Sequence, residues 1–177
     1  MDEPVETLRL FLALWPGPRT RAALAACRDG WHWPPGARPV ATAKLHLTLH
    51  FIGAVARPRL PALVAGLQRP CPRFVLAFGH AELWPRGTAV LRPLDESAAL
   101  HDLYAGLGEA LRRLELPVEA RPWRAHVTLA RRAAGAQPAP TPPLLHWPVQ
   151  AYALVQSLPG SPGGYRVLHR YPGAARA

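Results

Sequence analysis

Apolar and polar residues alternate along several short segments of the chain, which is the period of a β-strand with one buried face. The alternation is clearest at residues 7–14, 46–53 and 126–131. Shorter apolar runs predict further strands at 74–78, 88–91, 149–157 and 165–170. Turns rich in Pro and Gly separate these runs, for example at residues 84–87. Residues 159–164 predict an irregular hairpin connection.

Three segments have the period of an amphipathic helix instead: residues 19–28, 58–67 and 96–114. The last has Leu at 100, 103, 107 and 111, with Asp95 or Ser97 as its N-cap. This order of elements predicts an α+β fold of mostly antiparallel sheet with outer helices. Because a helix precedes a His-bearing strand twice, we expect two pseudo-symmetric lobes around a central cleft, within one bilobal domain over residues 1–177.

Two of the predicted strands carry the same polar pair. One contains His46-Leu47-Thr48-Leu49 and the other His126-Val127-Thr128-Leu129, eighty residues later. Side chains two residues apart share a face of a strand, so each imidazole lies beside its own Thr hydroxyl. If the two strands converge, these four side chains form a symmetric site for acid–base chemistry on an anion. His50 is expected on the same face as His46, at the rim or in contact with substrate.

The distribution of charge favours an anionic partner. The formal net charge is +10, and no carboxylate occurs between Asp29 and Glu82 or after Glu119. Both His-Thr segments therefore lack nearby partners for a Ser-His-Asp triad or a carboxylate-rich metal centre, although residues distant in sequence remain available. The pattern suits a phosphodiester or an RNA end. Chance clustering of only eleven acidic residues is the alternative.

Composition also limits the cellular context. No apolar stretch approaches the roughly 20 residues that span a bilayer, and the acidic N-terminus lacks the features of a signal peptide. We therefore expect a cytoplasmic monomer that has no membrane contact and no obligate protein partner. Cys27 and Cys71 lie in unlike surroundings without CxxC spacing and are expected to be free thiols.

The paired motifs and their flanks resemble the two-histidine phosphoesterases, and among these the RNA 2′,3′-cyclic phosphodiesterases, historically called 2′-5′ RNA ligases. The resemblance is carried by residues 9–14, 45–53, 121–131, 157–158 and 164–168. The strand after Gly87 and the short, Pro-rich loop at 133–143 depart from the family pattern. These departures bear on the range of substrates more than on the chemistry.

The resemblance implies hydrolysis of RNA ends, or small cyclic nucleotides, that carry a 2′,3′-cyclic phosphate. His46 is then the proton donor to O3′ and His126 the proton acceptor from water, and the product is a 2′-phosphate, with no metal and no cofactor. The residues alone leave the order of acid and base open. Reversal with a 5′-hydroxyl would give minor 2′-5′ ligation.

The remaining candidate residues surround this pair. Thr48 and Thr128 are placed to donate hydrogen bonds to phosphoryl oxygens. Arg131, Phe11 and His50 are candidates for substrate binding. None of the Trp residues at 31, 33, 84, 123 and 147 is singled out for stacking on a base.

Two other functions fit the sequence less well. The chain could be a non-catalytic RNA-binding module that acts through its basic surface. It could also be a metallohydrolase built on His46, His50 and His126, although the lack of nearby carboxylates counts against this.

Overall fold

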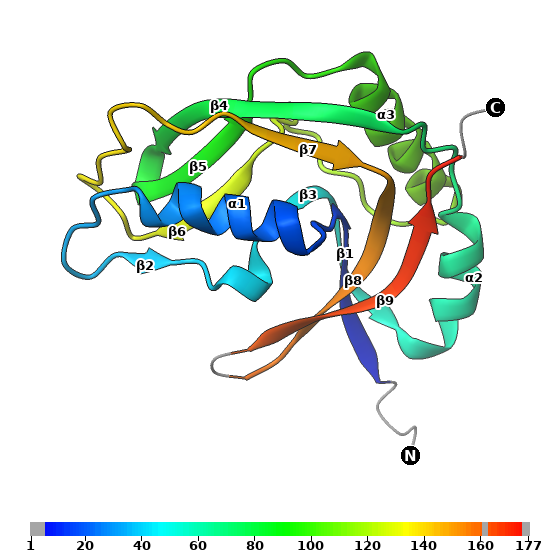
Figure 1. Cartoon of the computed structure of the whole chain (residues 1–177). Helices are drawn as coiled ribbons and strands as arrows, with labels where there is room; N and C mark the ends of the chain where they lie inside the picture. Colours follow the sequence, from blue (N-terminus) through cyan, green and yellow to red (C-terminus); the bar gives the residue numbers. More distant parts are fainter. Residues whose placement is uncertain (1–5, 161–162, 175–177) are drawn as a thin grey trace.

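One curled, antiparallel sheet dominates the computed structural model, which describes residues 6–160 and 163–174 (Figure 1). The strand order is β7-β4-β5-β6-β3-β1-β8-β9, with β2 beside β6. The strands are β1 (Thr7–Leu14), β2 (Arg38–Pro39), β3 (Leu47–Ala56), β4 (Phe74–Trp84), β5 (Thr88–Pro93), β6 (Val127–Arg131), β7 (Leu145–Val149), β8 (Ala151–Leu158) and β9 (Gly164–Pro172). The helices are α1 (Pro18–Asp29), α2 (Leu60–Gly66) and α3 (Ala98–Arg113), with short 3-10 turns at Thr42–Lys44, Arg57–Arg59 and Pro85–Gly87.

The sheet consists of two halves of four main strands each. The first half is β3-β1-β8-β9 and the second is β7-β4-β5-β6. Across their junction, β3 and β6 pair only at Leu47 and Val127 in the described residues. This architecture confirms the predicted α+β fold with two lobes.

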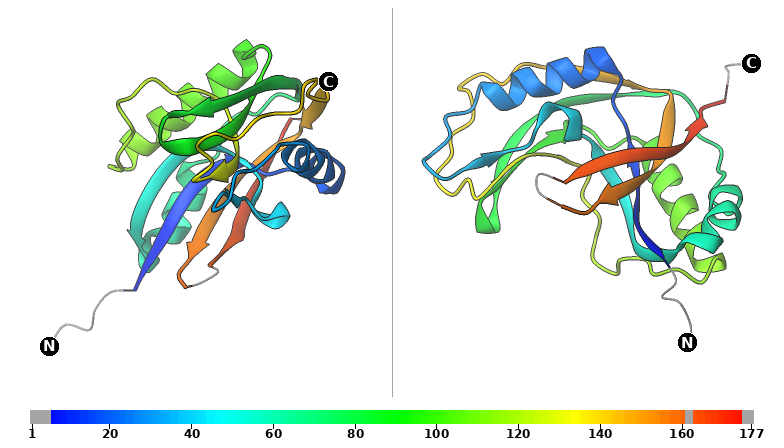
Figure 2. Two further views of the ribbon diagram at one scale, coloured as in Figure 1. Left: turned by 90° about the vertical axis from the view of Figure 1, so that its left-hand side faces the viewer. Right: turned by 90° about the horizontal axis from the view of Figure 1, so that it is seen from below.

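The curl of the sheet follows from its connectivity. Strands β7 and β8 lie near opposite ends of the strand order, yet only Gln150 separates them in the chain. The sheet must therefore bend back on itself, and Figure 2 shows this half-barrel shape from two further sides. The end of β9 returns to the same corner, where the N–H of Gly173 donates to the carbonyl of Gln150 (2.6 Å).

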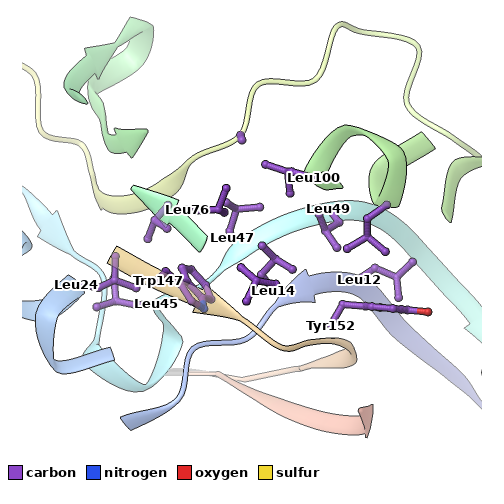
Figure 3. Close-up of a cluster of buried hydrophobic side chains, with 14 of the residues drawn as sticks. Leu12, Leu14, Leu24, Leu45, Leu47, Leu49, Leu76, Leu100, Trp147 and Tyr152 are labelled. Atoms are coloured by element: carbon purple, nitrogen blue, oxygen red, sulfur yellow. The ribbon is translucent and has the colours of Figure 1, made fainter. Parts of the chain in front are cut away.

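Leucine side chains from both halves fill the main core. Figure 3 shows Leu47 and Leu49 of β3 on the same side as Leu100 of α3. Leu24 of α1 lies beside Leu45 and close to Trp147 of β7. Helix α3 begins after Ser97, whose hydroxyl accepts a hydrogen bond from the N–H of Leu100 (3.2 Å), as the predicted N-cap requires.

Strand prediction was less complete than helix prediction. Strand β4 runs to Trp84, six residues beyond the predicted end, and β2 and β7 were not predicted. In β7 the apolar alternation is interrupted by Pro148, and in β2 only two residues pair. The predicted connection at 159–164 includes Ser161 and Pro162, which lie outside the described residues.

None of the helices in the described part of the chain combines the length and the apolarity that crossing a bilayer demands.

Gly87 ends the turn between β4 and β5 beside the loop that follows β6. Its φ is +71°, and a Cβ added there would lie 2.6 Å from the backbone nitrogen of Ala134 and 2.9 Å from that of Ala133. We therefore expect Gly87→Ala to lower the free energy of unfolding by about 3 kcal/mol, because backbone strain and a backbone clash combine.

Gly36→Ala is the matched control for this substitution. Gly36 has a φ of +83° but no atom within 4 Å of an added Cβ, so only the strain of about 1 kcal/mol remains. Urea unfolding of both variants measures the difference. Equal losses in the two variants would show that the close approach at Gly87 contributes nothing.

Candidate active site

A cleft of about 1550 Å³ lies where the two halves of the sheet meet. It is lined by both histidines and both threonines of the paired motifs, together with Arg131 and Phe11. The predicted convergence of the two motifs therefore occurs. Six of the seven candidate residues line this cleft, and His50 does not.

The register of the sheet explains the convergence. Leu47 and Val127 are paired, and both side chains are fully buried in the core. Their neighbours along the two strands point to the other face of the sheet, toward the cleft. Because the strands are antiparallel, His46 lies on the side of Thr128, and Thr48 on the side of His126. The result is a local two-fold arrangement of two imidazoles and two hydroxyls.

Each imidazole is oriented by a carbonyl two residues earlier in the chain. Nδ1 of His46 lies 2.6 Å from the carbonyl oxygen of Lys44, and Nδ1 of His126 lies 2.8 Å from that of Arg124. A carbonyl oxygen only accepts, so Nδ1 carries the hydrogen in both rings and Nε2 is left for chemistry. In His46, Nε2 lies 2.9 Å from Oγ1 of Thr48, which donates to it when the ring is neutral.

Burial and nearby cations favour the neutral form of both imidazoles. Burial lowers the pKa of His46 to about 4, opposed by the bond to the Lys44 carbonyl and assisted by the charges of Arg21, His126 and Arg131. Burial also lowers the pKa of His126, with help from Arg131, Arg92 and Arg124. An anion bound between the rings would oppose both effects, because it stabilises the imidazolium form.

Aromatic rings surround His46. Trp15 stacks on its imidazole with the ring centroids 5.5 Å apart, and Phe11 and Tyr165 lie at 5.1 and 5.2 Å. Arg21 lies over the ring of Trp15, with its Cζ 5.2 Å from the ring centroid. These contacts restrict the rotation of His46 and desolvate it.

Arg21 also fixes the backbone that leads to His46. Its Nη1 donates to the carbonyls of Thr42 (3.0 Å), Ala43 (2.8 Å) and Leu45 (3.3 Å), and its Nη2 donates to that of Pro16 (3.2 Å). The segment before β3 is thereby held against helix α1, which begins at Pro18.

Whereas aromatic rings surround His46, His126 lies beside a network of charged side chains around Trp84. The ring of Trp84 lies 4.5 Å from that of His126, and its indole N–H donates to Glu82 (2.6 Å). Arg124 is paired with Glu82 at 3.2 Å and lies over Trp84, with its Cζ 4.7 Å from the ring centroid. Trp84 is thus held from two sides as a wall beside His126.

The backbone of Ala125, directly before His126, is held by two charged side chains. Ala125 donates its N–H to Glu96 (3.2 Å), and its carbonyl accepts from Nε of Arg92 (3.4 Å). Arg92 in turn pairs with Glu96 (2.9 Å) and Glu82 (3.3 Å). These bonds replace a sheet ladder, because β6 begins only at Val127.

A side-chain hydrogen bond adds a second link between the segments that carry the two motifs. The indole N–H of Trp123, three residues before His126, donates to the backbone carbonyl of Thr48 (3.2 Å). The segment that carries the second histidine is therefore attached to the strand that follows the first.

His50 lies on the opposite face of the sheet, so the prediction that it shares the face of His46 was wrong. A β-bulge at Leu49 is the reason, because Ala13 pairs with Thr48 whereas Leu12 pairs with His50. His50 is buried, stacks on Tyr104 at 4.1 Å and bonds through Nε2 to the carbonyl of that residue (2.8 Å). A metal site built on His46, His50 and His126 is therefore not formed.

Several residues of the cleft were not predicted. Trp84, Tyr165, Phe51, Arg38 and Lys44 line it, and Trp15 stacks on His46. None of them belongs to a paired motif, although Phe51 and Tyr165 lie in segments that resemble the phosphoesterases. The cations among the lining residues are Arg9, Arg38, Lys44 and Arg131, and these residues include no carboxylate. The cleft is thus suited to an anion.

Comparison with known families decides the classification. A sequence model of the 2′-5′ RNA ligase superfamily matches residues 16–158, which include both His-Thr motifs. The chain belongs to this superfamily. The family predicted from the paired motifs is therefore confirmed.

Two relatives and a solved structure resemble the chain over most of its length. The RNA 2′,3′-cyclic phosphodiesterase of Thermus thermophilus is 33% identical over 165 residues, which cover 85% of this chain and 82% of that protein. The RNA 2′,3′-cyclic phosphodiesterase of Escherichia coli is 35% identical over 160 residues, covering 88% and 86%. A crystal structure of E. coli LigT complexed with 3′-AMP is 28% identical, has a TM-score of 0.81, and matches 96% of this chain and all of the other.

Proposed function

We propose that the protein hydrolyses 2′,3′-cyclic phosphate ends of RNA, or of small nucleotides, to 2′-phosphomonoesters by two-histidine acid–base catalysis. The observation that supports this most directly is the convergence of His46, Thr48, His126 and Thr128 on one cation-lined cleft. The relatives named RNA 2′,3′-cyclic phosphodiesterase support the choice of substrate.

In the proposed reaction, Nε2 of His126 accepts a proton from water as the water oxygen attacks phosphorus. Nε2 of His46 donates its proton to O3′ as the P–O3′ bond breaks on the opposite side. The ring opens, and the phosphate stays on O2′. The two-fold arrangement supports in-line attack, because a phosphorus atom bound between the two motifs would have one imidazole on each side.

The hydroxyls and Arg131 act on the phosphoryl oxygens. Negative charge grows on the two non-bridging oxygens in the transition state, and donors already in place lower the barrier. Thr48, which bonds to Nε2 of His46, would turn its hydroxyl to the phosphoryl oxygen on substrate binding and release Nε2. Thr128 would act in the same way from the other half.

The pKa shifts predict an unusual pH dependence. His126 acts unprotonated and its pKa is lowered, so the rising limb of kcat/KM, where His126 loses its proton, lies below about pH 6.5. His46 acts protonated and its pKa is about 4, so its active fraction falls as the pH rises from there. We expect a bell-shaped dependence of kcat/KM with its maximum on the acid side of neutrality.

The same reasoning separates kcat from kcat/KM. A bound phosphodiester raises the pKa of His46 through its negative charge, so the falling limb of kcat lies at higher pH than that of kcat/KM. Steady-state rates between pH 3 and 9 measure both limbs. A flat profile from pH 5 to 8.5 would contradict paired catalytic imidazoles.

The test of the proposed function is hydrolysis of a nucleoside 2′,3′-cyclic phosphate, with the product identified by phosphorus NMR. We expect only the 2′-phosphate, and undiminished activity after dialysis against EDTA. A 3′-phosphate product, or activity that metal restores, would contradict the mechanism. Incubation with cyclic-phosphate and 5′-hydroxyl RNA ends tests the minor 2′-5′ ligation, which is absent if no joined product forms.

A further inference from the structure

The cleft continues past the catalytic pair along the first half of the sheet. Its lining there includes Arg9, Phe11, Phe51 and Gly53. Phe51 is 64% exposed, the highest value among the large apolar side chains of the described residues. An exposed aromatic ring in a cationic cleft is a feature of proteins that bind single-stranded nucleic acids.

Phe51 lies between two bulges of β3, and the first of them brings it to this face. The first turns His50 into the core, and the second lies between the pairs Phe11–Phe51 and Leu10–Gly53. Phe51 therefore lies directly across from Phe11, with the ring centroids 6.2 Å apart. Phe11 is only 4% exposed and lies between His46 and Phe51. Phe51 is thus one ring further from the histidine, and its surface is free to contact a ligand.

Arg9 lies beside this ring on the same face. It precedes Phe11 by two residues on β1 and is exposed, and its neighbours across the sheet are Ala54 and Ser157. Gly53 leaves open space next to Phe51, since a Cβ added there would meet no atom within 4 Å. This end of the cleft therefore combines a cation, an open aromatic ring and unfilled space.

A free nucleoside 2′,3′-cyclic phosphate has too few groups to use this region. Its single phosphate lies between the histidines, and its base is attached to the same ribose. In the proposed arrangement that base meets the rings that contact the histidines, Tyr165 and Trp84. A base and a phosphate one step further along the cleft belong to the neighbouring nucleotide of a chain.

We propose that Phe51 and Arg9 form a subsite for the nucleotide that precedes the cyclic phosphate, which makes an RNA end a better substrate than a free cyclic nucleotide. Phe51 stacks on the base of that nucleotide, and Arg9 binds its phosphodiester. Because stacking accepts any base, the subsite selects for chain length and not for sequence. This inference rests on the proposed function, since it takes the histidine pair as the position of the cyclic phosphate.

The first experiment compares adenosine 2′,3′-cyclic phosphate with a diadenosine that ends in the same group. For Phe51→Ala we expect the ratio of kcat/KM, dinucleotide over mononucleotide, to fall roughly 10- to 100-fold, as the loss of one base stack predicts. Phe51→Tyr keeps a ring and keeps the ratio. Leu144→Ala removes a side chain that is 59% exposed outside the cleft and is the matched control. A wild-type ratio in Phe51→Ala would overturn the proposal.

The second experiment measures binding, so that it does not depend on hydrolysis. A short RNA with a 2′-phosphate end is titrated against the protein at several salt concentrations. Arg9→Gln is expected to make the slope of log affinity against log salt shallower by about 0.7, the value for one phosphate contact on a single strand. The exposed Arg113→Gln on α3 serves as the control.

An unchanged slope in Arg9→Gln would remove Arg9 from the subsite. If the wild-type protein hydrolyses neither substrate, the proposed function fails, whereas the binding measurements still decide whether the subsite exists.

Discussion

Replacement of either His46 or His126 by alanine should lower kcat by roughly 10²- to 10⁴-fold, the usual contribution of a general acid or base. Each imidazole is half-buried in the cleft, and its Nδ1 is bound to a carbonyl, so Nε2 is the ring nitrogen left to act on the substrate. Because the two histidines act in one step, the double variant should be little slower than the slower single variant.

Three measurements make this prediction decisive. Circular dichroism checks that the variants fold, RNA binding checks that the cleft is intact, and His146→Ala controls for loss of an exposed histidine outside the cleft. Retained binding with lost hydrolysis supports the enzyme over an RNA-binding module. Near wild-type hydrolysis in either single variant would disprove the catalytic role of that residue.

Valine at position 48 or 128 should lower kcat by roughly 10²- to 10³-fold, as for the loss of one donor to a transition-state oxyanion. Valine has nearly the same shape as threonine, so the change removes the hydroxyl and little else. KM should change much less than kcat, since the donated bond strengthens as charge develops on phosphorus.

Serine at the same positions is the matched control, because it restores the hydroxyl while losing a methyl group. We expect Thr48→Ser and Thr128→Ser to keep most of the wild-type kcat. If the valine variants matched the serine variants, the hydroxyls would have no part in stabilising the transition state.

The sequence was sufficient for the parts of the site that depend on local alternation. His46 with Thr48, and His126 with Thr128, reach the cleft because two residues in a regular strand share a face. His50 did not follow the same rule, because the bulge at Leu49 depends on pairing with β1 and leaves no local signal. Periodicity therefore predicted side-chain direction up to the first irregularity of the ladder.

The walls of the site could not be predicted, because they come from segments far apart in sequence. Trp15, Tyr165 and Trp84 reach the histidines only through the order of strands in the sheet. The scarcity of carboxylates around the motifs in the sequence also did not predict which carboxylates lie near them in space. Glu82 and Glu96 come close to the His126 segment from β4 and from the turn before α3, where they bind arginines and Ala125.

Within the described residues, β3 and β6 pair only at Leu47 and Val127, directly behind the catalytic side chains. Both side chains are fully buried, and each also pairs within its own half of the sheet, Leu47 with Leu14 and Val127 with Leu91. The alignment of the two motifs therefore rests on core packing, so a change of volume at either position acts on catalytic geometry as well as on stability.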